Sequence, residues 1–263
     1  MDLKIKGNSA LITASSSGLG KAVATALVKE GVNVVVNGRN EERLNKTVKE
    51  LKVINKGQVV GQVADITKKE DIKKLVEKTY NTYGRLDHLV TSAGGPPSKS
   101  FIETSDEDWY KSFDLLVMSV VRIVRESLDY LKEGDGGTIV KLTSISVKEA
   151  IEDLVLSNSV RMSVIGLMKT LSKELGPKIR VNAILQGLHE TDRVKYLLEK
   201  QVENGNFKTY EEALKSKSSN IPLKRLGEPM ELGEFVTFLC SKKASYLNGT
   251  SIVLDGGASS SNL

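Results

Sequence analysis

Apolar residues follow two alternating patterns along the chain. Short runs rich in valine, isoleucine and leucine alternate with longer segments in which apolar residues recur at helical spacing. Short apolar runs of this kind are typical of strands buried on both faces, and their alternation with helices predicts a parallel sheet covered by helices on both sides. The predicted strands are 9–13, 32–37, 58–64, 87–91, 138–142, 179–185 and 251–254, and the predicted helices are 18–30, 41–53, 68–83, 105–131 and 155–175.

One segment, 187–222, departs from this alternation because it has helical patterns and no strand. It follows the carboxyl end of a predicted strand, where ligands bind in open parallel sheets. We therefore expect this segment to form a helical lid over a substrate. Nothing else divides the chain, and its length suits one large α/β domain. The sequence predicts a single Rossmann-type domain, a doubly wound parallel sheet, spanning 1–263.

Charge and composition narrow the range of partners. The 38 Lys and Arg are interleaved with 33 Asp and Glu, as in 40–43 and 68–71, which is typical of solvated helix faces rather than of a nucleic-acid surface. No apolar stretch approaches the ~20 residues of a membrane span, and the N-terminus lacks the apolar segment of a signal peptide. The single cysteine, Cys240, lies in an apolar helical stretch and is interpreted as buried filler. We expect a cytoplasmic protein that contacts neither nucleic acid nor membrane and has no metal site.

A glycine-containing loop joins the first predicted strand to the first predicted helix. Residues 13–20 read Thr-Ala-Ser-Ser-Ser-Gly-Leu-Gly. Gly18 and Gly20 would let the backbone approach a pyrophosphate closely, and the helix N-terminus supplies free N–H groups and the positive end of a dipole. Two glycines are also compatible with a tight turn that serves packing alone, so the loop by itself is a candidate phosphate site.

Further motifs follow this loop in order. Asp65-Ile66 comes after the third predicted strand and Thr91-Ser92-Ala93-Gly94 ends the fourth; residues 180–191 read Arg-Val-Asn-Ala-Ile-Leu-Gln-Gly-Leu-His-Glu-Thr, and 254–257 read Leu-Asp-Gly-Gly. In order and spacing these motifs resemble those of the short-chain dehydrogenase/reductase family over essentially the whole chain, and within it the β-ketoacyl-carrier-protein-reductase-like members. Ala14 stands in place of the family's first loop glycine, and Gln186 in place of its proline.

The resemblance implies a nicotinamide dinucleotide site at the carboxyl ends of the strands. The residues it assigns to the cofactor are Ser15, Ser16, Ser17, Gly18, Leu19, Gly20, Asn37, Arg39, Asp65, Ile66, Ser92, Ala93, Gly94, Arg161, Gln186, Gly187 and Thr191.

The residues after the second predicted strand bear on the choice of cofactor. Gly38 stands where NAD-preferring relatives carry an acid that would accept hydrogen bonds from the ribose and repel a 2′-phosphate. Arg39 can instead pair with that phosphate, although an exposed arginine at this place needs no ligand. The pattern favours NADP, with NAD possible.

The catalytic positions of the family are largely replaced. Relatives use a serine, a Tyr-x-x-x-Lys pair and a distant asparagine; here the serine is Ser144, while Ser157 and Arg161 replace tyrosine and lysine and Leu116 replaces asparagine. A serine hydroxyl is far less acidic than tyrosine, whose pKa is ~10, and arginine stays protonated and cannot relay a proton. The family's ordinary proton transfer is therefore not expected.

Two functions remain open. The first is an NADP-dependent oxidoreductase that acts on an unknown carbonyl or alcohol through an atypical centre of Ser144, Ser157 and Arg161. The second is a nucleotide-binding pseudoenzyme that acts as a regulatory or scaffold module. A purely structural subunit is a weaker third idea, because the phosphate loop is largely intact.

Other groups could replace the missing proton donor. His189 titrates near neutrality but is more simply an exposed loop histidine, and Tyr196 and Tyr210 lie in the predicted lid. The resemblance also implies a homotetramer or homodimer that pairs through the helices 105–131 and 155–175. The apolar run at 115–118 fits such pairing and fits core packing equally well.

Overall fold

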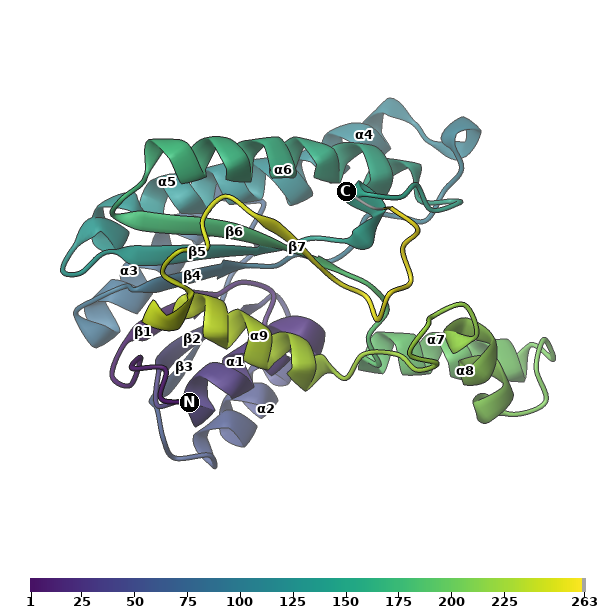
Figure 1. The fold of residues 1–263 in the computed structure, drawn as a ribbon, viewed down its shortest axis with the longest axis horizontal. Coiled ribbons are helices and arrows are strands. Elements are labelled where there is room, and N and C mark those ends of the chain that lie inside the picture. The colour runs from purple at the N-terminus through teal and green to yellow at the C-terminus, as the bar shows by residue number, and fades with distance from the viewer. Residues whose placement is uncertain (262–263) are drawn as a thin grey trace.

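The predicted strands form a single sheet. The computed structural model describes residues 1–261, and within them seven parallel strands lie in the order β3-β2-β1-β4-β5-β6-β7 (Figure 1). The chain builds outward from β1 to β3 and then crosses back to place β4 on the other side of β1, which creates a crevice at the carboxyl ends. This confirms the predicted Rossmann-type fold. The strands are β1 (Ser9–Ile12), β2 (Asn33–Gly38), β3 (Val59–Val63), β4 (His88–Thr91), β5 (Gly137–Leu142), β6 (Ile179–Gln186) and β7 (Ser251–Leu254).

Helices cover both faces of the sheet, as Figure 1 shows. Each strand sends alternate side chains to opposite faces; on β5, Val140 and Leu142 enter the core under α1 and α9, whereas Ile139 enters the core under α3, α5 and α6. Burial on both faces explains why the strands are continuous apolar runs. One face carries α1 (Gly18–Lys29), α2 (Glu41–Lys52) and α9 (Pro229–Cys240), and the other carries α3 (Lys69–Tyr83), α4 (Asp106–Phe113), α5 (Ser119–Lys132) and α6 (Val155–Glu174).

The segment expected to be one helix over 105–131 is interrupted. A π-helical turn, Asp114–Met118, separates α4 from α5. Within this turn Leu116 and Val117 are buried in the core against α5 and α6. The apolar run at 115–118 thus serves core packing, the second of the two interpretations that the sequence left open.

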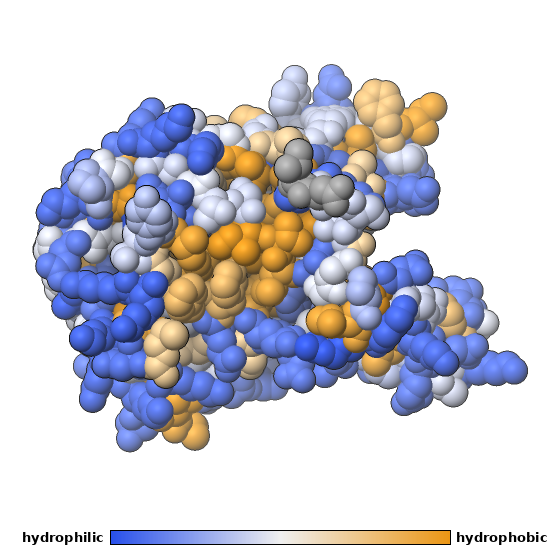
Figure 2. All heavy atoms as spheres, viewed as in Figure 1, coloured by the Kyte–Doolittle hydropathy of each residue, from blue (hydrophilic) through white to orange (hydrophobic). Residues whose placement is uncertain are grey.

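The segment after β6 has helices and no strand, as predicted. Figure 1 shows α7 (Asp192–Glu203) and α8 (Tyr210–Ser218) extending away from the body of the protein, and Figure 2 shows a hollow between them and the body. Figure 2 also shows apolar side chains gathered at the centre of this face, where β7 and α9 lie. Ile252 and Leu254 of β7 are only partly buried there. No helix in the described part of the chain is long and apolar enough to cross a membrane.

The turn that follows β1 has a strained residue. Ala14 adopts a left-handed backbone with φ of +47°, a region that favours glycine. The turn also brings backbone very close to Gly20, where a Cβ atom would lie 2.5 Å from the Ala14 carbonyl oxygen. Glycine is therefore required at position 20, whereas at position 14 alanine is tolerated at a cost.

We expect Ala14→Gly to raise the free energy of unfolding by about 0.5–1 kcal/mol, because it relieves a left-handed alanine. Urea denaturation measures the change. Ala26→Gly in α1, where the backbone is ordinary helix, is the matched control and should lower stability by about 1 kcal/mol or more. If both variants lower the free energy of unfolding equally, the backbone of Ala14 is not strained.

Candidate functional site

A large cleft opens at the carboxyl ends of the strands, where the strand order reverses. Its walls come from the turns after β1, β2, β3 and β4, the end of β6 and the start of α7. Most residues that the resemblance assigned to a dinucleotide line it together. These are Ser16, Ser17, Gly18, Leu19, Gly20, Asn37, Arg39, Asp65, Ile66, Ser92, Ala93, Gly94, Arg161, Gln186 and Thr191.

Two assigned residues, Ser15 and Gly187, do not line the cleft. The Ser15 hydroxyl is buried; it donates to the Ile12 carbonyl at 2.7 Å and accepts the Asn37 N–H at 2.8 Å. Gly187 faces the opposite way, because a Cβ atom there would lie 2.7 Å from the Cβ of Asp255. Both residues belong to the motifs, and both adjoin the cleft without lining it.

Asn37, at the end of β2, holds the glycine loop in place. Its side-chain oxygen accepts the Ala14 N–H at 3.2 Å, and its amide donates to the carbonyls of Gln62 at 3.2 Å and Ala64 at 3.0 Å. The side chain therefore joins the ends of β1, β2 and β3. The loop begins α1, whose N-terminus lines the cleft at Gly18 and Gly20 and suits an anionic group.

The residues after β2 form a positively charged end of the cleft. Arg39 and Arg43 both line it, and Asn40 caps α2 by accepting the Arg43 N–H at 2.8 Å. Arg43 was not predicted, although the cap pattern Asn-Glu-Glu-Arg could have placed it on the first helical turn. At Gly38 a Cβ atom would lie 2.5 Å from the Ser16 hydroxyl, so the acid of NAD-preferring relatives does not fit here without a shift of Ser16.

Asp65, after β3, is held as a carboxylate. Burial acts to raise the pKa of Asp65, but hydrogen bonds from the Thr67 N–H and hydroxyl, together with the charge of Arg39, lower it below its usual range. Asp65 and the neighbouring Ile66 both line the cleft near Arg39.

The expected catalytic residues lie in one hydrogen-bonded chain. Arg161 Nε donates to Ser157 Oγ at 3.0 Å, one turn earlier on α6, and Ser157 Oγ shares a hydrogen bond of 3.0 Å with Ser146 Oγ. Ser144 Oγ, just after β5, accepts the Ser146 N–H at 3.1 Å. Within this chain Arg161 lines the cleft, whereas Ser144, Ser146 and Ser157 do not. Ser146 was missed because only the folded turn brings it to Ser157.

Burial changes the charges around this chain. Burial lowers the pKa of the Arg161 guanidinium to about 10, which leaves it protonated at neutral pH. Lys141, on β5, is fully buried, and burial together with the charge of Arg161 lowers its pKa to about 7. Lys141 was not predicted as a site residue, although a lysine inside an apolar strand pattern is itself a signal.

The other candidate proton donors lie elsewhere. His189 is buried, not the exposed loop histidine that was expected, because its ring packs against Gly227; it lines a separate cavity with Arg225 and Glu231. Burial lowers the pKa of His189. Tyr196 is 55% exposed. The Tyr210 hydroxyl is 3.3 Å from Glu190 Oε1, and neither tyrosine lines the cleft.

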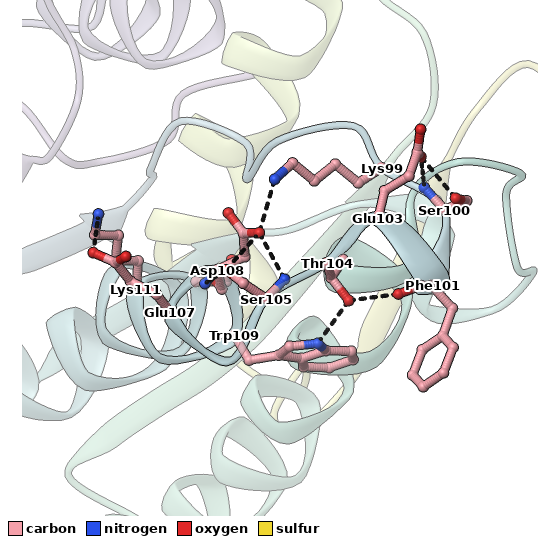
Figure 3. A network of polar contacts seen from close by, with 11 residues as sticks. Lys99, Ser100, Phe101, Glu103, Thr104, Ser105, Glu107, Asp108, Trp109 and Lys111 are labelled. Carbon is pink, nitrogen blue, oxygen red and sulfur yellow. Dashed lines mark hydrogen bonds and ion pairs between the residues drawn. The ribbon is translucent and has the colours of Figure 1, made fainter.

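The loop after β4 borders the cleft at Gly94 and Gly95 and is anchored where α4 begins. Figure 3 shows Lys99 paired with Asp108 at 2.8 Å, and the Trp109 indole N–H donating to the Thr104 hydroxyl at 3.1 Å. The Lys99 ammonium and hydrogen bonds from Ser105 lower the pKa of Asp108 to about 2. These contacts hold the loop beside the start of α6, where the backbone of Lys99 forms a parallel β-bridge with Leu154.

Comparisons with known proteins identify the family. A family model described as "Enoyl-(Acyl carrier protein) reductase" matches residues 13–259. The chain is 32% identical over 256 residues to the 3-oxoacyl-[acyl-carrier-protein] reductase FabG of Thermotoga maritima, covering 97% of this chain and 99% of that protein. The chain belongs to the short-chain dehydrogenase/reductase family. Its ketoreductase-like character, predicted from the motifs, is confirmed.

Solved structures of this family superpose closely. L-sorbose reductase from Gluconobacter frateurii, complexed with NADPH and L-sorbose, is 31% identical with a TM-score of 0.95, over 99% of this chain and 100% of that chain. A short-chain oxidoreductase from Pseudomonas aeruginosa PAO1, described as containing an atypical catalytic center, is 29% identical with a TM-score of 0.90, over 97% and 98% of the two chains.

Proposed function

We propose that this short-chain dehydrogenase/reductase is an NADP-dependent oxidoreductase that acts on a carbonyl or alcohol through Ser144, Ser157 and Arg161. One observation carries the proposal: Arg161 both lines the dinucleotide cleft and begins the hydrogen-bonded chain to Ser157 and Ser146. The NADPH bound in L-sorbose reductase supports the cofactor, and the oxidoreductase with an atypical catalytic center supports a departure from the usual residues.

The residues along the cleft support binding of a dinucleotide phosphate. The close backbone approach at Gly20 leaves the α1 N-terminus free to bind the pyrophosphate. Arg39 and Arg43 would hold a 2′-phosphate, and Asp65 and Ile66 would flank the adenosine. At the other end Ser92, Ala93, Gly94, Gln186 and Thr191 would surround the nicotinamide half.

The centre is suited to stabilise negative charge rather than to deliver a proton. When bound, NADPH supplies the hydride. Ser144 accepts the Ser146 N–H, which leaves its own hydroxyl proton for a substrate oxygen. Arg161 stays charged and stabilises an oxyanion, but it does not give up a proton. Loss of a general acid costs roughly 10²–10⁴ in rate, so slow turnover is expected.

A second function is favoured by the same substitutions. Replacement of tyrosine by Ser157, lysine by Arg161 and asparagine by the fully buried Leu116 leaves the cleft intact and removes the usual proton path. A nucleotide-binding regulatory or scaffold module would have this appearance. A turnover assay with NADPH and a panel of carbonyl compounds separates the two functions.

Arg39→Ala should weaken NADP binding by about one to two orders of magnitude, because a charge-assisted hydrogen bond contributes about 1.5–3 kcal/mol. Calorimetry with NADP and NAD measures the effect. NAD affinity, which involves no 2′-phosphate, should hardly change, and Arg43→Ala should show a smaller loss of the same kind. Equal affinity of the unmodified protein for NADP and NAD would refute the assignment.

The double variant Ser157→Tyr with Arg161→Lys should gain reductase activity on diketones or quinones by at least about ten-fold, because it restores a general acid and its lysine. The single variants are the controls, since a phenol beside arginine lacks a group that passes its proton onward. Family-like rates are not expected while Leu116 occupies the asparagine position. A fast unmodified protein and a slower double variant would show that another donor operates.

Light scattering should give a mass of two or four times 28.7 kDa. The resemblance motivates this expectation, and exposed apolar side chains on α4 and α6, such as Tyr110 and Met162, are consistent with pairing through these helices. Met162→Glu should shift the protein toward the monomer, whereas Tyr246→Glu, at a fully exposed site elsewhere, should not. A monomeric unmodified protein at micromolar concentration would rule the oligomer out.

A further inference from the structure

A second cation lies behind the catalytic centre. Lys141 is 1% exposed, and its Nζ atom has no hydrogen-bond partner within residues 1–261. Lysine is almost never fully buried unless it is paired, because removing an ammonium from water without a partner is costly. Its position in the middle of the sheet, on β5, makes this an unusual placement for a residue with no function.

Lys141 lies directly behind the wall of the cleft. It shares a face of the sheet with Ile139, the face that packs against α5, and its register partner on β4 is Thr91, whose hydroxyl is also buried without a partner in the described chain. Both side chains line one narrow gap, which has no room for a water molecule. Ser92 and Ile66 line both this gap and the cleft, so Lys141 lies close to the cleft wall.

Arg161 is the one charged group that acts on Lys141 in the described part of the chain. It reaches the site from α6, and the side chains that face Lys141 from the other elements are uncharged. These are Thr13 after β1, Ile66 after β3, Thr91 and Ser92 of β4 and the turn that follows, Ser119, Val120 and Ile123 of α5, and the register partner Ala183 of β6. Within residues 1–261 no acid lies within ion-pair distance of Lys141 or Arg161.

We infer that Lys141 and Arg161 make the cleft select the reduced over the oxidised dinucleotide. The inference rests on the proposed function, which places a nicotinamide dinucleotide in this cleft. Oxidised nicotinamide carries a positive charge and reduced nicotinamide does not, while the phosphates of the two forms are the same. At an effective dielectric constant of about 20, repulsion by a nearby like charge is enough to change a binding constant on the order of ten-fold.

The pH dependence follows from burial. Because burial and Arg161 lower the pKa of Lys141 to about 7, the amine is charged below neutral pH and becomes neutral above it. Repulsion of the oxidised ring by Lys141 is therefore greatest at low pH and disappears as pH rises. By linkage, binding of the oxidised form near pH 7 should release a proton from Lys141. Binding of the reduced form should not.

The test measures the dissociation constants of NADPH and NADP⁺ by calorimetry between pH 6 and 9. Their ratio cancels groups that titrate equally with both forms, such as the 2′-phosphate. For the unmodified protein the preference for NADPH should fall by about ten-fold as pH rises across this range. In Lys141→Met, which keeps the side-chain length and removes the charge, the preference should be independent of pH and equal to the value of the unmodified protein at high pH.

A second variant keeps the test decisive if Lys141→Met folds poorly. Arg161→Met should keep a pH dependence but move it to higher pH, because the pKa of Lys141 rises when the neighbouring charge is removed. Calorimetry of the unmodified protein in two buffers of different ionisation enthalpy should show proton release on binding NADP⁺ near pH 7. If both forms bind with a ratio that neither pH nor Lys141→Met changes, the inference is wrong and the proposed function stands. If neither form binds, both are overturned.

Discussion

The cleft depends on the buried amide of Asn37, which ties together the carboxyl ends of three parallel strands. Its side chain bonds to the backbone of Ala14, Gln62 and Ala64, and its own N–H donates to Ser15 Oγ. A buried amide whose donors and acceptor are all satisfied rigidifies its surroundings, and one that lost a partner would be strongly destabilising. The glycine loop needs this support, because it contains a left-handed alanine and a backbone approach too close for any side chain. The direction of the first α1 N–H groups, and hence the anion site, follows from this constraint.

The sequence predicted the sheet and the outline of the cleft for physical reasons that act locally. Strands buried on both faces are continuous apolar runs, and the phosphate loop is recognisable because only particular residues fit its backbone. The sequence did not predict contacts between residues that are far apart along the chain. Ser146 reaches Ser157 only when the turn after β5 packs on α6, and His189 is buried only because Gly227 lies against its ring. Motif membership also failed to say which way a residue faces.

Ser15 and Gly187 belong to motifs and do not line the cleft, whereas Arg43 belongs to no motif and does. The Ser15 hydroxyl bonds to the backbone of β1 and β2. The backbone of Gly187 packs against Asp255. Arg43 stands outside every motif and lines the cleft because a helix cap places it on the first turn of α2. Spacing along a chain determines which residues are near a site, whereas caps, turns and strand pleat determine which of them face it.

The energetic cost of Lys141 bears on whether this centre is functional or lost. A fall in the pKa of Lys141 from 10.5 to about 7 corresponds to about 5 kcal/mol against its charged form, a large part of the stability of an ordinary domain. An apolar side chain of similar length would avoid that cost, since residues such as Ile139 and Val120 already surround the position with apolar surface. A site without any remaining task has no physical reason to place two cations, Lys141 and Arg161, together without an acid. A buried charge lacks a protein partner where a ligand supplies that partner or where the charge itself has a function. The burial of these two cations therefore favours a centre that controls charge at a bound dinucleotide over a scaffold that has merely kept the fold.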